Sequence, residues 1–175
     1  MERRQIKLLR DANIAIGHQL QHTAVGFGRV FHDIQTANGI VDHVVVGQGG
    51  IYAVNVIARP SAKNGTVEIR DNDLRFLPGE RDICIVDTVA KTSRLERELS
   101  VMLNHRIRIR SVIAVPGWQI HGQTSDDHLV VNENNLPMLW GWKDKADYLM
   151  DEDVQAIHEQ LTSRCRRSGE TRQES

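Results

Sequence analysis

The sequence predicts an α/β domain in which helices flank a mixed sheet. Three observations lead to this fold class. The first segment has a helical period, three strand-like segments follow it, and a second helical segment leads into a strand whose last part is entirely apolar. A chain of 175 residues has the size of one domain, since domains usually contain about 100 to 200 residues. We predict a single domain over residues 1–163 and a mobile C-terminal tail over residues 164–175.

The first helix is predicted over residues 5–23, because apolar side chains recur there at helical spacing with Arg and Lys on the other side. Gly17 lies inside this segment and weakens its helix propensity. The recurring apolar positions are Ile6, Leu9, Ile16 and Leu20.

A three-strand meander is predicted next, at residues 29–34, 40–46 and 51–58, because these segments are rich in β-branched residues. Asn38-Gly39 is a two-residue hairpin signal, and Gly47-Gln48-Gly49-Gly50 is the second turn. The third strand is apolar on both faces apart from Asn55, so the middle of the meander should be buried.

The second half of the chain continues with a hairpin at residues 66–70 and 74–77, an amphipathic helix over 85–105 and a strand over 107–115. The apolar end of that strand should enter the centre of the sheet. A short strand and two helices complete the chain, with Asp151 as the N-cap of the last helix, and they are predicted at residues 128–131, 133–139 and 151–163.

Composition excludes several classes of protein. With 22 Lys+Arg and 23 Asp+Glu, the net charge of -1 provides no global attraction for nucleic acid, so such contacts must come from a local patch. The cysteines, Cys84 and Cys165, have no metal-binding spacing, and the first residues do not resemble a secretory signal. No apolar run approaches the roughly 18 residues of a membrane span. We therefore expect a cytoplasmic protein, with any membrane association through segments outside this chain.

The segment VFHDIQTANGIVDHVVVGQGGIYAV, residues 30–54, resembles the nuclease-related domain (NERD) family of the PD-(D/E)xK nuclease superfamily. The Arg97-Glu98-Leu99 helix segment, RIRIRSVIAVPGW and HLVVNENNL also resemble that family, so the likeness covers roughly residues 5 to 140. The resemblance implies a restriction-endonuclease-like core of helix, three-strand meander, helix and strand.

The resemblance also implies a metal site, which this sequence keeps only in part. The metal-binding aspartate of the family corresponds to Asp42, whereas Asn55 and Ile57 stand at the positions of its glutamate and lysine. Such nucleases hold Mg²⁺ between carboxylates, and the lysine assists the attacking water. Because Asn55 is neutral and Ile57 carries no charge, metal binding at Asp42 should be weak or lost. Asp42 could equally be a structural carboxylate capped by backbone N–H groups.

Four arginines are candidates for contacts with nucleic acid. Strand alternation would place Arg59 on the face of Asn55 and Ile57, where it could bind phosphate but not act as a base. Alternation also predicts that three further arginines line one strand face, able to meet successive phosphates, and these are Arg106, Arg108 and Arg110. A merely solvated strand face is the alternative interpretation.

Two histidines, His18 and His22, have the spacing of metal ligands on a helix, but no third ligand is evident from the sequence. An exposed helix face explains them equally well.

We expect a nuclease-related domain with impaired catalysis, acting in DNA binding or as an interaction module. No cofactor is then expected. The alternative is an active deoxyribonuclease that requires Mg²⁺ or Mn²⁺ and has a relocated site, with Glu68 or Asp73 as migrated carboxylates. A third possibility is a structural domain beside a membrane or another domain. The expected partners are DNA, another protein or a domain absent from this chain.

Overall fold

The computed structural model describes residues 2–60, 62–79, 81–122, 128–142 and 144–165. Its main helices are α1 (Glu2–Thr23), α2 (Val86–Leu103) and α3 (Asp151–Arg164), with the 3-10 helices η1 (Leu136–Gly141) and η2 (Lys145–Asp147). Its strands are β1 (Gly28–Thr36), β2 (Gly39–Gly47), β3 (Gly50–Val56), β4 (Thr66–Arg70), β5 (Asp73–Leu77), β6 (Arg81–Cys84), β7 (Ile109–Ala114), β8 (Gln119–Ile120) and β9 (His128–Val131). None of the helices within the described ranges is long and apolar enough to cross a membrane.

The central sheet has the strand order β1-β2-β3-β7-β9. The meander β1-β2-β3 is antiparallel, whereas β7 runs parallel to both β3 and β9. The prediction of an α/β fold with a mixed sheet is thus confirmed. Helix α2 provides the crossover that brings β7 beside β3, as a parallel connection requires.

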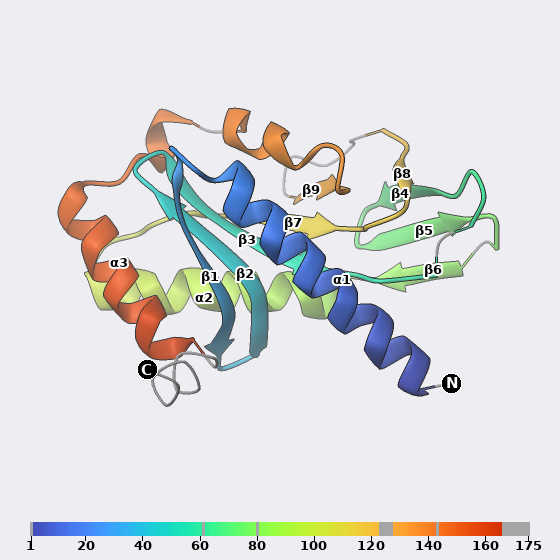
Figure 1. Cartoon of the computed structure of the whole chain (residues 1–175). Coiled ribbons are helices and arrows are strands. Elements are labelled where there is room, and N and C mark those ends of the chain that lie inside the picture. The colour runs from blue at the N-terminus through green and yellow to red at the C-terminus, as the bar shows by residue number, and fades with distance from the viewer. Residues whose placement is uncertain (1, 61, 80, 123–127, 143, 166–175) are drawn as a thin grey trace, which may run out of the picture.

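Helices cover both faces of the central sheet (Figure 1). On one face, Ile16 and Leu20 of α1 pack with Val45 and Tyr52 of the sheet. On the other face, α2 and α3 pack against the same strands, through residues that include Leu95, Leu99, Ile157 and Leu161. Strand β3 is buried along its whole length, as its apolar sequence predicts.

A second sheet has the order β6-β5-β4-β8 and lies beyond the end of β3 (Figure 1). The sequence predicted the β4–β5 hairpin but not β6 or β8. These two strands are too short to show a clear alternation of apolar and polar residues. Trp118, Phe76 and Ile113 join this sheet to the central one through a shared apolar cluster.

Several element boundaries differ from the prediction. Thr36 pairs with Gly39, so the hairpin loop is Ala37-Asn38 and not Asn38-Gly39. The N-cap of α3 is Met150, and Asp151 is the first helical residue. The helix predicted at residues 133–139 is the 3-10 helix η1, which has a proline in its first turn.

The first two residues of the predicted tail contact β1. The Arg164 guanidinium pairs with Glu98 and donates to the Gln35 carbonyl oxygen at 3.4 Å. The backbone of Cys165 forms an isolated antiparallel β-bridge with Ile34, and the Cys165 Sγ lies 2.9 Å from the His32 carbonyl oxygen. Residues 166–175, the rest of the predicted tail, lie outside the described residues.

Candidate functional site

Asp42 and Asn55 lie side by side on β2 and β3, because the pair His43–Val54 sets the register of these strands. The Asp42 backbone N–H donates to Asn55 Oδ1 at 3.4 Å, and Asp42 Oδ2 accepts from the Val56 N–H at 2.8 Å. Asn55 Nδ2 donates to Thr92 Oγ1 of α2 at 3.3 Å. The two positions that the family resemblance singled out are therefore neighbours, and both side chains are bound within the fold.

The surroundings of Asp42 make its charged form costly. Burial raises the pKa of the Asp42 carboxyl above its ordinary value of 3.8, and the charge of Asp33 raises it as well. The Val56 N–H, the Lys91 charge and a hydrogen bond from the Asn13 side chain all oppose this effect. A carboxylate that is already desolvated and hydrogen-bonded, beside a neutral amide, is a poor site for Mg²⁺, which prefers several carboxylate and water oxygens.

Asp33 lies opposite Asp42 on β1. The flanking pairs His32–His43 and Ile34–Val41 fix this position, and Asp33 itself adopts a left-handed backbone with φ of 54°. Such a backbone is uncommon for a residue other than glycine. The sequence suggests His32-Asp33 only as an acid–base pair, and that interpretation is set aside because adjacent strand residues point to opposite faces, so Asp33 was not assigned to the surroundings of Asp42.

Two helices bring further polar groups to Asp42. Asn13 comes from α1, and Lys91 comes from α2. The aliphatic part of the Lys91 side chain passes close to Gly39, where a Cβ added to the glycine would lie 3.1 Å from Lys91 Cδ. Both residues are far from Asp42 in sequence, so local patterns could not have identified them.

Ile57 and Arg59 do not join Asp42. Strand β3 ends at Val56, and the Ile57 side chain packs against the apolar cluster of the second sheet. The Arg59 guanidinium carbon lies 5.2 Å from the centroid of the Phe76 ring. The alternation that was expected to place Arg59 beside Asn55 is therefore interrupted, and this prediction is wrong.

The predicted arginine face is also different in the structure. Arg106 and Arg108 are exposed and precede β7, but Arg110 is 9% exposed. Its Nη2 lies 2.7 Å from Asp147 Oδ2, and its guanidinium carbon lies 4.6 Å from the centroid of the Trp142 ring. Arg110 therefore does not share an exposed strand face with Arg106 and Arg108, and that part of the prediction is wrong.

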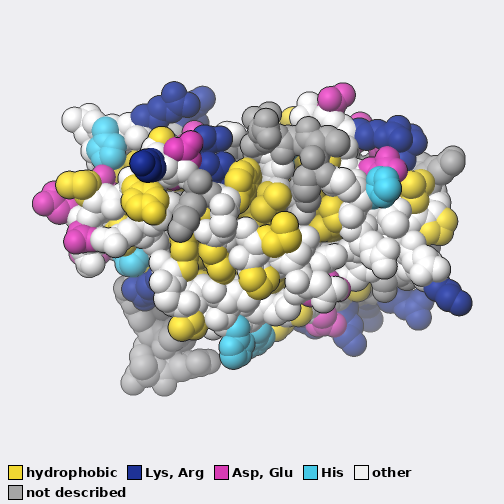
Figure 2. Space-filling model, turned by 90° about the horizontal axis from the view of Figure 1, so that it is seen from above, with side chains coloured by type: hydrophobic (Ala, Val, Ile, Leu, Met, Phe, Trp, Pro, Cys, Tyr) yellow, Lys and Arg dark blue, Asp and Glu magenta, His cyan; other side chains and the backbone are white. Residues whose placement is uncertain are grey.

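Arg106 and Arg108 also lie away from Asp42. They come just before Ile109, which pairs with Ile51 at the start of β3, whereas Asn55 pairs with Ile113 near its end. Seen from above, basic side chains lie mostly toward the ends of the molecule and hydrophobic ones toward the middle (Figure 2). Among the described residues on that face, the basic side chains therefore form no continuous track for a nucleic acid.

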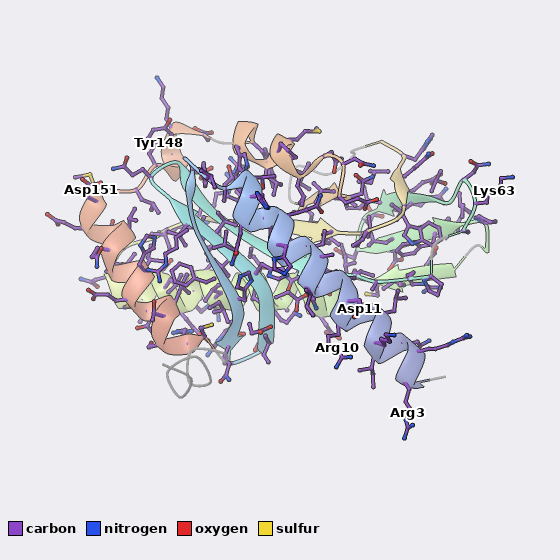
Figure 3. All side chains as sticks on the ribbon, in the orientation of Figure 1. Arg3, Arg10, Asp11, Lys63, Tyr148 and Asp151 are labelled. Carbon is purple, nitrogen blue, oxygen red and sulfur yellow. The ribbon has the colours of Figure 1, made fainter. Side chains whose placement is uncertain are left out.

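A further group of exposed cations lies on α1, before Asn13 in the sequence. The N-terminal half of this helix extends past the sheet, with Arg3 and Arg10 pointing outward (Figure 3). We call residues 3–10 the basic arm, and its exposed cations are Arg3, Arg4, Lys7 and Arg10. The arm ends one helical turn before Asn13, the α1 residue that contacts Asp42. The sequence showed these cations on the polar side of the first helix but did not indicate that the helix projects from the body.

Comparisons with protein-family models, with curated proteins and with solved structures found no match to this chain.

Proposed function

We propose that this chain is a domain with a restriction-endonuclease-like core that binds the phosphate backbone of DNA without cutting it. The observation that carries the proposal is the pairing of Asp42 with Asn55. In the family that the sequence resembles, these two positions carry carboxylates, whereas this chain offers one partly buried carboxylate and one neutral amide.

The chemistry of the pair argues against efficient hydrolysis. Asn55 contributes no charge, its Nδ2 is directed at Thr92, and Ile57 belongs to an apolar cluster. The residues present therefore do not fit Mg²⁺ or Mn²⁺ in the arrangement that the family resemblance implies. No step of hydrolysis is assigned to them.

The basic arm supports backbone binding. Four exposed cations follow one another along the projecting half of α1, and Asp11 is the anion that follows them. Lys and Arg side chains neutralise phosphates in a manner independent of base sequence. The arm leads along α1 to Asn13, which contacts Asp42. A duplex bound by the arm would therefore pass near the Asp42–Asn55 pair.

DNA binding can be tested by fluorescence anisotropy with a labelled duplex at several salt concentrations. If about four phosphates are neutralised, the slope of log affinity against log salt should be about -3 to -4. Replacing the four arm cations by Gln, a good helix former, should weaken binding and flatten this slope. Replacing Arg106 and Arg108 by Gln is the matched control, and it should change the affinity and the salt slope far less.

Absence of binding at low salt would contradict the proposal and leave a role in protein interaction. An equal loss in the Arg106 and Arg108 control would assign the interface to that end of the sheet instead.

A second candidate function is metal-dependent cleavage by a relocated site. Asp33 and Lys91 favour it, because their charges act on Asp42 and could replace the missing carboxylate and lysine. Plasmid cleavage that requires Mn²⁺ and is abolished by Asp33→Asn and by Lys91→Met would establish this alternative. We expect the plasmid to remain intact.

A further inference from the structure

A small cavity lies between α1 and the β1–β2 strands, with a volume of about 180 Å³. His18, Gln21 and Gly17 border it from α1, and His32 and His43 border it from the sheet. Three histidines from separate parts of the sequence therefore face one space. The sequence pattern paired His18 with His22, but His22 does not line this cavity.

The two sheet histidines are already in direct contact. His32 Nδ1 lies 2.8 Å from His43 Nδ1, and His32 Nε2 lies 2.8 Å from Gln21 Nε2. One proton must lie between the two Nδ1 atoms, since each neutral imidazole has one donor and one acceptor nitrogen. His43 is 5% exposed, and His32 is partly buried.

We propose that His32, His43 and His18 form a binding site for a borderline transition-metal ion, with Zn²⁺ as the best-fitting ion. Two Zn–N bonds of about 2.0 to 2.1 Å at a tetrahedral angle separate the nitrogens by roughly 3.3 Å. For the ion to replace the shared proton, the two Nδ1 atoms need to part by about half an ångström from their present distance of 2.8 Å, and each ring must turn so that its lone pair points at the ion.

The cavity provides room for this movement. Gly17 lies over both rings, and a Cβ there would be 3.0 Å from His43 Cε1 and 3.3 Å from His32 Cε1. In the described part of the chain, no three His, Cys, Asp or Glu side chains already converge as a metal site. The exposed His18 must therefore turn into the cavity to become the third ligand, and water would complete the tetrahedron.

Gln21 is placed to support the metal-bound form. When His32 Nδ1 binds the ion, its Nε2 carries the proton, and rotation of the Gln21 amide lets its oxygen accept that proton in a hydrogen bond. Ligating histidines usually make such a bond through their other nitrogen. Imidazole ligands favour Zn²⁺ over Mg²⁺, so this site differs in chemistry from the Asp42 cluster and does not depend on the proposed DNA binding.

Isothermal titration of the full chain with Zn²⁺ at neutral pH should show one site, which Mg²⁺ does not occupy. His32→Gln should abolish binding, and His18→Gln should weaken it at least about tenfold, since even outer-shell changes cost about 10- to 100-fold. His22→Gln is the matched control on the same helix and should leave the affinity unchanged.

Cobalt gives a readout that needs no variant, in case substitution of the buried His43 prevents folding. Co²⁺ bound to the unmodified protein should give the intense visible absorption of a tetrahedral site, and Zn²⁺ should displace it. The proposal fails if the unmodified protein binds no Zn²⁺, if Co²⁺ remains octahedral, or if His22→Gln weakens binding as much as His18→Gln.

Discussion

The Asn55 carboxamide oxygen accepts a hydrogen bond from the Asp42 backbone N–H at 3.4 Å, across the β2–β3 pair. The same carboxamide donates to Thr92 of α2, so it links two strands to a helix. An ionised Glu at position 55 could accept the first bond but could not donate the second. Asn55 is thus suited to the internal hydrogen bonds of the fold, and this supports a structural role for the pair.

The stability of the Asp42→Asn variant should depend on pH relative to the unchanged protein. Burial raises the pKa of Asp42, so the native state holds this proton more tightly than the unfolded chain does. The protonated Asp42 carboxyl stabilises the native state fully when the pH is below the pKa of the unfolded chain. This stabilisation is lost as the pH rises through the higher pKa of the native state. Asn cannot ionise and still offers an oxygen to the Val56 N–H. The variant should therefore gain stability relative to the unchanged protein as pH rises above about 4.

Urea unfolding at several pH values measures this difference. Asp11→Asn, an exposed change on α1, is the control and should alter the free energy of unfolding by less than about 0.5 kcal/mol. A relative stability of Asp42→Asn that falls with rising pH would show that other interactions outweigh the burial of the carboxylate.

Replacing Gly17 by Ala should destabilise the protein although Ala is the better helix former. The new Cβ would press on His43 Cε1 at 3.0 Å and His32 Cε1 at 3.3 Å. Overpacking costs typically about 1 to 3 kcal/mol, against a gain of about 1 kcal/mol in helix propensity. We expect a net loss of about 1 kcal/mol by chemical denaturation. Ala15→Gly, at an exposed position of the same helix, measures how much helix propensity alone changes the free energy of unfolding. A denaturant midpoint that is higher for Gly17→Ala than for the unchanged protein would contradict the packing argument.

Replacing Arg110 by Met should cost about 3 to 5 kcal/mol, because it leaves the Asp147 carboxylate buried without its cation. The side chains of Arg110 and Asp147 are 9% and 2% exposed. The double variant Arg110→Met with Asp147→Leu should be less destabilised than this single one. Arg70→Ala, which removes an exposed pair with Glu68, should cost less than about 1 kcal/mol. Equal costs for the two arginine variants would argue against a buried pair.

Tyr52 should resist ionisation in alkaline solution. Burial and the nearby Asp147 charge raise its pKa from 10.0 to about 12, although the Arg110 charge opposes this. Its hydroxyl donates to the Trp142 carbonyl oxygen at 2.8 Å. The protonated Tyr52 hydroxyl therefore stabilises the native state fully when the pH is below the pKa of tyrosine in the unfolded chain. This stabilisation is lost as the pH rises through the higher native pKa. Absorbance titration of the Tyr148→Phe variant measures the ionisation of Tyr52, and circular dichroism shows whether the protein is still folded. Ionisation of Tyr52 near pH 10 in the folded protein would contradict this prediction.

Local patterns in the sequence were sufficient to predict most of the elements. Helices α1 and α2, the meander and the β4–β5 hairpin follow from apolar periodicity and turn residues, which operate over a few positions of the chain. Asp42 and Asn55 also became neighbours as expected, because a short turn between antiparallel strands sets their register. Errors of one or two residues occurred where several turn residues adjoin, as at Asn38 and Gly39.

Only the tertiary structure decided which side chains meet across long stretches of sequence. It buried Arg110 against Asp147, placed Arg59 over Phe76, and brought Asp33 and Lys91 to Asp42. It also brought His18 to the cavity of His32 and His43, although the sequence suggested His22 as its partner. The physical reason is that periodicity fixes the face on which a side chain lies within its own element. The partner of that face depends on how helices cross the sheet and where each strand ends, and packing of the whole core determines both.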